Sequence, residues 1–283
     1  MGELGKPYLL LKGGTSPHSY ALRPSDARAL QSARLVFWIG QELERFLSKP
    51  LKVLGAKARK VRLIEAKGVK TLRLREGGVW ADHGDAHGQD KARKPNKGQA
   101  HDREQGHGDE EHDAHIWLDP QNAKAMVSTI VAALAQADPD NAAAYRANAA
   151  ALTGRLGALD RELEAKLAPV RASPFIVFHD AYQYLERRYR LRAAGSITLD
   201  PGRTPGARRL SEIREIIRAR RAHCVFAEPQ FRPGLVGTVI ESTGARAATL
   251  DPLGARLKPG TEAYFTLMRR LADSLTGCLK AGS

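Results

Sequence analysis

Histidines and acidic residues are concentrated in one stretch of the first half of the chain, from Asp82 to Asp113. Imidazole and carboxylate groups are ligands for borderline metals such as zinc, and a His-rich tract is a compositional sign of metal binding. The stretch has no apolar periodicity, so it cannot bury enough apolar surface to offset the entropy of ordering it. We therefore expect a disordered loop that binds additional metal weakly, with a merely solvated linker as the alternative. Its histidines are His83, His87, His101, His107 and His112.

Three further histidines occupy positions where a folded site could collect them. His18 follows an expected strand and its Gly-Gly turn, His115 comes where the acidic stretch ends, and His179 ends the apolar run 175–178. In open α/β sheets, ligands bind at the carboxyl ends of strands. Asp251 follows another expected strand in the same way. Three imidazoles with a carboxylate or a water molecule would form a tetrahedral site that suits zinc.

Short apolar runs alternate with amphipathic stretches along most of the chain, which predicts an α/β fold with mainly parallel sheets. Ser25 is the expected N-cap of the first helix. We expect strands at 7–12, 35–39, 61–65, 72–74, 175–178, 195–199, 224–226 and 247–250. We expect helices at 26–33, from Pro120 to the Asp138-Pro139 break, and at 141–167, 181–190, 205–221, 235–242 and 261–279, with a helix or turn at 42–47.

The stretch 141–167 is rich in Ala, Leu, Arg and Glu, and it predicts one long helix in the middle of the chain. At 1.5 Å per residue it would be on the order of 40 Å long. Such a helix could be a rigid strut between two lobes. One arm of a helical bundle is the alternative, but the expected strands on both sides disfavour it.

The composition narrows the function classes. The 283 residues are enough for two compact lobes, and the formal net charge of +14 raises the possibility of nucleic-acid binding. The basic residues are spread over amphipathic helices beside acids, without a nucleic-acid-binding motif, so we do not expect that function. No apolar run approaches the roughly 20 residues needed to span a bilayer. The two cysteines, Cys224 and Cys278, are too far apart for a zinc ribbon and could be buried thiols or one disulfide.

Several motifs along nearly the whole chain give it a specific family resemblance. They resemble those of the periplasmic zinc-binding proteins of bacterial high-affinity zinc ABC importers, which are solute-binding proteins. The resemblance implies two α/β lobes, each with a mainly parallel sheet, joined by one long rigid helix, with the metal in the cleft between the lobes. The implied lobes are 1–138, with the loop 82–113, and 170–283, with the linker helix at 139–169. The motifs are the segment 16–26, the His-rich loop, 115–120, 178–182, 226–231 and 249–254.

By this resemblance, His18 and His115 are zinc ligands from the first lobe and His179 is the ligand from the second. Asp251 matches a carboxylate of manganese-binding relatives and is the fourth ligand that the resemblance implies, with water as the alternative. The resemblance also implies a disulfide between Cys224 and Cys278.

The resemblance further implies a periplasmic monomer that is not an enzyme, delivers zinc to an inner-membrane ABC permease, and has an auxiliary zinc chaperone as a possible partner. The chain opens at Met1 without the signal peptide, first strand and first helix of the family. We expect a truncated or misassigned start.

Three alternatives remain open at this point. A manganese or iron carrier of the same family would use a similar site. A zinc hydrolase would also use three histidines with an open fourth position, and Glu228 is the best candidate for its general base, although a structural hydrogen bond is the favoured role for that residue. In a metal-buffering protein, the His-rich loop would be the whole function.

Overall fold

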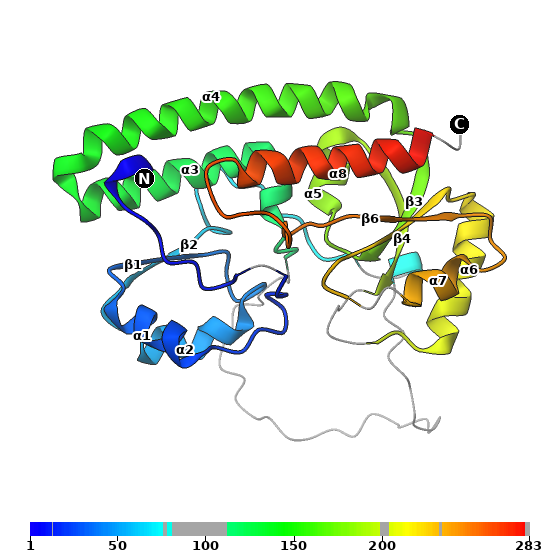
Figure 1. The fold of residues 1–283 in the computed structure, drawn as a ribbon, viewed down its shortest axis with the longest axis horizontal. Coiled ribbons are helices and arrows are strands. Elements are labelled where there is room, and N and C mark those ends of the chain that lie inside the picture. The colour runs from blue at the N-terminus through cyan, green and yellow to red at the C-terminus, as the bar shows by residue number, and fades with distance from the viewer. Residues whose placement is uncertain (13, 76–77, 81–111, 199–203, 232–233, 281–283) are drawn as a thin grey trace, which may run out of the picture.

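The computed structural model of the chain describes residues 1–12, 14–75, 78–80, 112–198, 204–231 and 234–280. Two parallel sheets lie side by side beneath long helices (Figure 1). The first sheet pairs β1 (Leu35–Trp38) with β2 (Arg59–Arg62). The second sheet has the strand order β4-β3-β5-β6 and is parallel throughout. Its strands are β3 (Pro174–His179), β4 (Arg192–Thr198), β5 (Cys224–Ala227) and β6 (Arg246–Thr249).

The helices fall into three groups. The first sheet is flanked by α1 (Pro24–Ser32) and α2 (Ser48–Val53). Three long helices, α3 (Pro120–Ala137), α4 (Ala142–Leu167) and α8 (Ala263–Lys280), run across the top of the molecule in Figure 1. The second sheet is accompanied by α5 (Gln183–Tyr189), α6 (Ala207–Arg220) and α7 (Gly234–Ile240). None of the described helices is long and apolar enough to cross a membrane.

The long helix α4 joins the two halves through a shared core. Its 26 residues give a length of about 39 Å. Leu156, Leu159, Leu163 and Leu167 recur every three or four residues, so they lie on one face, and all four are buried. Their core cluster includes β2 and β3 residues. The long helix and the α/β architecture are thus confirmed, while the domain boundaries at 138/139 and 169/170 stay a prediction.

The expected strand at 7–12 is wrong. The side chains of Tyr8 and Leu9 are 51% and 47% exposed, and the segment joins neither sheet. Instead, the Tyr8 hydroxyl donates a hydrogen bond to Asp26 Oδ1 of α1 at 3.0 Å, and Leu10 packs on the core of the first half. The apolar run therefore reflects docking by one leucine and one tyrosine, not a strand of a sheet.

Two smaller expectations also need correction. The first helix begins at Pro24, so its N-cap is Arg23, and Ser25 lies inside the helix. The backbone N–H of Arg23 donates a hydrogen bond to the Asp26 carboxylate at 3.0 Å. The expected strand at 72–74 is only an isolated bridge between Arg73 and His112.

A disulfide joins Cys224 at the start of β5 to Cys278 in α8, which confirms the implied pairing. It connects residues 54 positions apart. Because a cross-link restricts the unfolded chain, replacing both cysteines by serine should lower the free energy of unfolding by about 2–4 kcal/mol. Denaturant unfolding of the oxidised protein and of the double variant would measure the difference. A free energy of unfolding equal in both proteins would contradict this expectation.

Candidate metal centre

The structure brings His18, His115 and His179 together at one point between the two halves of the molecule. Each can offer one ring nitrogen such that these three atoms lie within 4.8 Å of one another. His115 is 6% and His179 is 3% exposed, while His18 is half-buried. Within the described part of the chain, this is the group of side chains found suitable for holding a metal ion.

His179 is oriented by a carboxylate on the neighbouring strand. Its Nδ1 donates to Glu228 Oε1 at 2.6 Å, because a carboxylate can only accept. The parallel register pairs Val177 with Phe226, so continuing both strands by two residues places His179 beside Glu228. This bond leaves the other nitrogen, Nε2, free to coordinate a metal.

His115 is oriented in the same way from within its own segment. Its Nδ1 donates to Asp113 Oδ1 at 2.7 Å, and its backbone N–H donates to the same oxygen at 3.0 Å. The short helix that follows, Ile116–Leu118, is held to the second half because Trp117 Nε1 donates to the Pro252 carbonyl at 2.9 Å. His115 therefore belongs to the first half but is fixed relative to the second.

His18 comes from a turn rather than from a strand end. Its backbone N–H donates to Ser16 Oγ at 3.3 Å, and the Ser19 N–H donates to the Ser16 carbonyl at 3.4 Å. Its Nε2 is buried and has no hydrogen-bond partner among the described residues. A buried nitrogen without a partner costs free energy, and a metal ion would satisfy it.

The distance between two of the imidazoles fits a tetrahedral zinc ion. His179 Nε2 and His115 Nε2 lie 3.3 Å apart. Zinc–nitrogen bonds of about 2.0–2.1 Å at tetrahedral angles would place two ligand nitrogens about 3.3 Å apart. Since both Nδ1 atoms donate to carboxylates, the two Nε2 atoms face each other and can share one proton or one metal ion. When His179 holds the proton, its Nε2–H donates to His115 Nε2, and a metal ion would take the place of that proton.

The surroundings shift the pKa values of two of these histidines in opposite directions. Burial lowers the pKa of His18 to about 3, and the neighbouring His115 and His179 add to the effect. Burial also lowers the pKa of His179, but the Glu228 carboxylate outweighs it, so that the pKa is raised above 6.5. His18 therefore offers a neutral nitrogen at any ordinary pH, whereas His179 holds a proton that a metal must displace.

Two buried carboxylates, Asp113 and Glu228, lie directly behind the ligand histidines. Asp113 is 0% and Glu228 is 3% exposed. One oxygen of each has no hydrogen-bond partner among the described residues. Their two negative charges would balance a bound dication in a site where water cannot do so.

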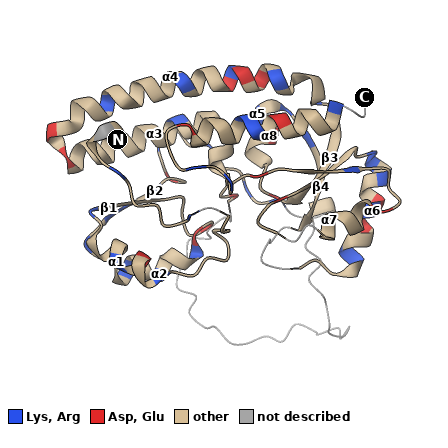
Figure 2. Ribbon diagram, in the orientation of Figure 1, with Lys and Arg blue, Asp and Glu red and all other residues tan. Residues whose placement is uncertain are grey.

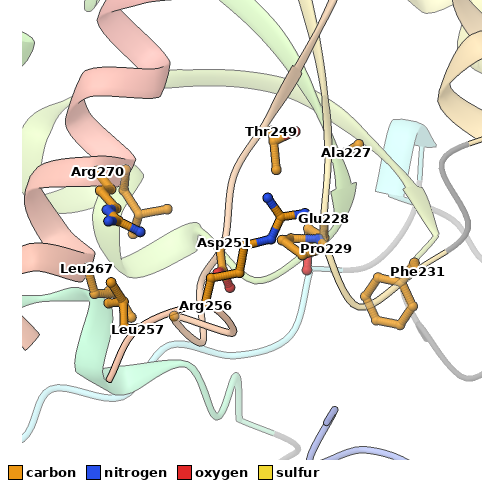
Figure 3. A pocket seen from close by; sticks show the side chains of 12 residues that line it. Ala227, Glu228, Pro229, Phe231, Thr249, Asp251, Arg256, Leu257, Leu267 and Arg270 are labelled. Atoms are coloured by element: carbon orange, nitrogen blue, oxygen red, sulfur yellow. The ribbon is translucent and has the colours of Figure 1, made fainter. Parts of the chain in front are cut away.

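Asp251 is not part of the three-histidine group. Its Oδ1 accepts from Gln230 Nε2 at 3.0 Å and from the Leu253 N–H at 3.3 Å, and its Oδ2 accepts from the Ala255 N–H at 2.7 Å. Figure 3 shows it with Glu228 in the wall of a pocket of about 420 Å³ at the carboxyl ends of β5 and β6. These hydrogen bonds fix the orientation of the Asp251 carboxylate in the turn that follows β6, and its role as a fourth ligand stays a prediction.

The loop histidines His83, His87, His101 and His107 lie outside the described residues. His112 is described, and it is half-buried next to the site, where it forms the bridge with Arg73.

The sequence does not reveal that Asp113 and Glu228 orient the ligand histidines. Asp113 belongs to the acidic stretch, although its position two residues before His115 is a usable signal. For Glu228 the sequence predicts a structural hydrogen bond, which the structure confirms, but not the partner of that bond. Its partner, His179, could have been found by aligning the two strands at their apolar runs.

Removing either carboxylate should weaken metal binding without removing a ligand. Asp113→Asn and Glu228→Gln keep the size of the side chain but remove its negative charge. The amide that replaces the carboxylate can also donate a hydrogen bond, so it no longer forces the histidine Nδ1 to be the donor. Loss of such a partner typically lowers metal affinity by about 10–100-fold. Competition with a zinc-sensitive dye would measure it, with Glu162→Gln on the exposed side of α4 as a control of the same chemistry. An unchanged affinity in both buried variants would contradict the proposed orienting role.

Comparisons with known proteins point to one family. A family model described as zinc-uptake complex component A, periplasmic, matches residues 1–278. The chain is 46% identical over 289 residues to the high-affinity zinc uptake system protein ZnuA of Brucella abortus (strain 2308), covering 99% of this chain and 86% of that protein. It is 36% identical over 277 residues to the protein of the same name from Yersinia pestis, covering 96% of this chain and 84% of that protein.

A solved structure, described as the crystal structure of ZnuA, matches with a TM-score of 0.79 and 27% identity, covering 98% of this chain and 92% of the other. The comparisons of sequence and of structure thus identify the same family. The chain belongs to the periplasmic zinc-uptake component A proteins, which are solute-binding proteins.

Proposed function

We propose that this protein captures Zn²⁺ with His18, His115 and His179 and delivers it to the permease of a zinc ABC importer. The observation that carries the proposal is the pair of nitrogens, His115 Nε2 and His179 Nε2, facing each other at 3.3 Å with their Nδ1 atoms bound to carboxylates. Membership of the zinc-uptake family supports the same reading. Location in the periplasm, action as a monomer and delivery to a permease, with or without a zinc chaperone, belong to this proposal, and membership of a periplasmic zinc-uptake family supports the location and the delivery.

The choice of zinc over manganese rests on the ligand type, and the choice of zinc over iron rests on membership of the zinc-uptake family. Three imidazoles suit zinc, whereas manganese prefers carboxylate and carbonyl oxygens. Water is the proposed fourth ligand, with Asp251 as the alternative. Competitive titration with Zn²⁺ and Mn²⁺ tests the choice in the wild type and in Asp251→Ala. We expect zinc to bind much more tightly in both, and stronger manganese binding in the wild type would overturn the assignment.

Catalysis is not part of the proposal, and the place of Glu228 supports this. Its Oε1 bonds the Nδ1 of His179, on the side of the ring away from the coordinating Nε2. Glu228 therefore lies behind a ligand and not beside the open coordination position, where a general base would have to act.

We propose that the His-rich loop, predicted at 82–113, binds further zinc weakly and that its part before Asp113 is not needed for the tight site. Asp113 itself orients His115 and belongs to that site. A segment whose sequence lacks the apolar pattern of an ordered element must lose chain entropy to surround a metal, whereas the three ligands of the tight site are held by the fold. Excising residues 82–109 should lower the number of zinc ions bound at saturation and leave the Kd of the tightest site within a few-fold. Isothermal titration calorimetry would give both numbers. Loss of the tight site in the deletion would show that the loop supplies an essential ligand.

A further inference from the structure

The second sheet has a distinctive edge at the end opposite the metal centre. All four strands are parallel, so their amino ends meet along one edge and their carboxyl ends along the other. The register pairs Pro174 with Arg192, Phe175 with Cys224, and Cys224 with Arg246. Because His179 ends β3, the metal centre lies at the carboxyl edge, and the amino edge faces away from it.

Arginines gather along this amino edge. Two of them begin strands, two end α6 just before β5, and two lie in the segments that precede β3 and β4. Neighbouring strands are about 4.8 Å apart, so the edge from β4 to β6 spans about 14 Å. Blue segments lie around α6 and the neighbouring end of the sheet in Figure 2. We call this set the basic edge: Arg171, Arg190, Arg192, Arg220, Arg221 and Arg246.

Only part of this positive charge is neutralised by acids within the described chain. Glu164 forms ion pairs with Arg171 and with Arg190, and Arg246 donates to the Cys278 carbonyl. The side chains of Arg192, Arg220 and Arg221 are exposed and form no hydrogen bond or ion pair with any described residue. Three guanidinium groups on one narrow edge are thus available to an anionic partner.

The surrounding surface indicates what kind of partner this is. Protein partners usually insert an aromatic or apolar anchor into a pocket, and single-stranded nucleic acids stack bases on exposed aromatic rings. The large hydrophobic side chains exposed in the described chain are Met1, Leu4, Tyr8, Leu9, Val53 and Leu74, and none of them belongs to the strands and helices that form the basic edge. A basic band without apolar anchors matches a flat, negatively charged surface, which is what a bilayer with anionic phospholipids presents.

We propose that the basic edge binds the anionic headgroups of a phospholipid membrane. In that orientation the metal centre, at the opposite edge of the sheet, faces away from the bilayer and stays open to zinc. The bound protein can therefore take up zinc but must leave this orientation before it delivers the ion to a permease. The proposal is independent of the metal ligands, so its failure would leave the zinc function untouched. Each arginine near an anionic membrane surface strengthens binding about fivefold.

The test is co-sedimentation of the full chain with phosphatidylcholine vesicles that contain or lack phosphatidylglycerol. The variant Arg192→Gln/Arg220→Gln removes two uncommitted charges, and Arg221 is kept because its φ of 51° lies in the left-handed region. The control Lys49→Gln/Lys52→Gln removes two exposed charges from α2 in the first half.

We expect the arginine variant to bind the anionic vesicles about 25-fold more weakly, and the control to stay within about twofold of the wild type. Zinc affinity should be the same in all three proteins, which also shows that they are folded. Equal loss in both variants would overturn the proposal, because binding would then follow net charge alone. So would equal binding to neutral vesicles, or a preference for double-stranded DNA over the anionic vesicles.

Discussion

Replacing His18, His115 or His179 by alanine is expected to lower the affinity of the tight site for zinc by tens of fold or more in each case. Each substitution removes one of three strong ligands, and water would have to replace an imidazole nitrogen. The largest loss is expected for His179→Ala, because it also leaves Glu228 buried without the donor that it now has at 2.6 Å. Competition with a chelator of known affinity would measure all three variants.

The histidine variants have a matched control in the chain. His223 lies just before β5, at the amino edge of the second sheet, far from the carboxyl edge where His179 ends β3. His223→Ala removes the same side chain without touching the metal centre, so its zinc affinity should equal that of the wild type. Unchanged affinity in all three ligand variants would rule out the proposed site.

Zinc is expected to raise the stability of the protein strongly at neutral pH and much less below about pH 6. A ligand that binds only the folded state stabilises it by RT ln(1 + [L]/Kd), about 4 kcal/mol at a free concentration a thousand times Kd. Thermal unfolding with and without zinc, followed from pH 8 to pH 5, would measure the effect.

The sign of the pH dependence follows from His179. Its pKa is raised, so in the metal-free protein it carries a proton up to a pH above 6.5, and zinc must displace that proton. Affinity therefore falls as pH falls through this pKa. His18, whose pKa is about 3, adds no such dependence in the measured range. Calorimetry in two buffers with different ionisation enthalpies should show proton release on zinc binding. A zinc-induced stabilisation that persists undiminished at pH 5 would indicate carboxylate ligands instead.

The sequence predicted the second half of the fold better than the first, for a physical reason. Runs such as Phe175–Phe178 and 224–226 are buried on both faces of a four-stranded sheet, and central parallel strands are read reliably from continuous apolar residues. Among the described residues, the sheet of the first half has two strands, and the apolar segments of that half pack individually. The run at 7–12 looks like a strand, yet only part of it meets the core.

The site shows the same contrast between local and long-range information. Each histidine could be picked out by its position after a strand, a turn or the acidic stretch. The partners that orient them depend on tertiary structure: Glu228 meets His179 across two strands that are 49 residues apart in the chain. Asp251 is predicted from its position after a strand and from the family resemblance. The structure adds that the turn after it donates hydrogen bonds to both of its oxygens, and its role as a ligand stays a prediction.

Anomalous diffraction at the zinc edge, on crystals grown with one equivalent of Zn²⁺, tests the central claim most directly. The predicted result is one strong peak within coordination distance, about 2.0–2.1 Å, of a ring nitrogen of His18, His115 and His179, with Asp113 and Glu228 behind it and not bound to it. A single peak held by the loop histidines, or by carboxylates without these three imidazoles, would contradict the account.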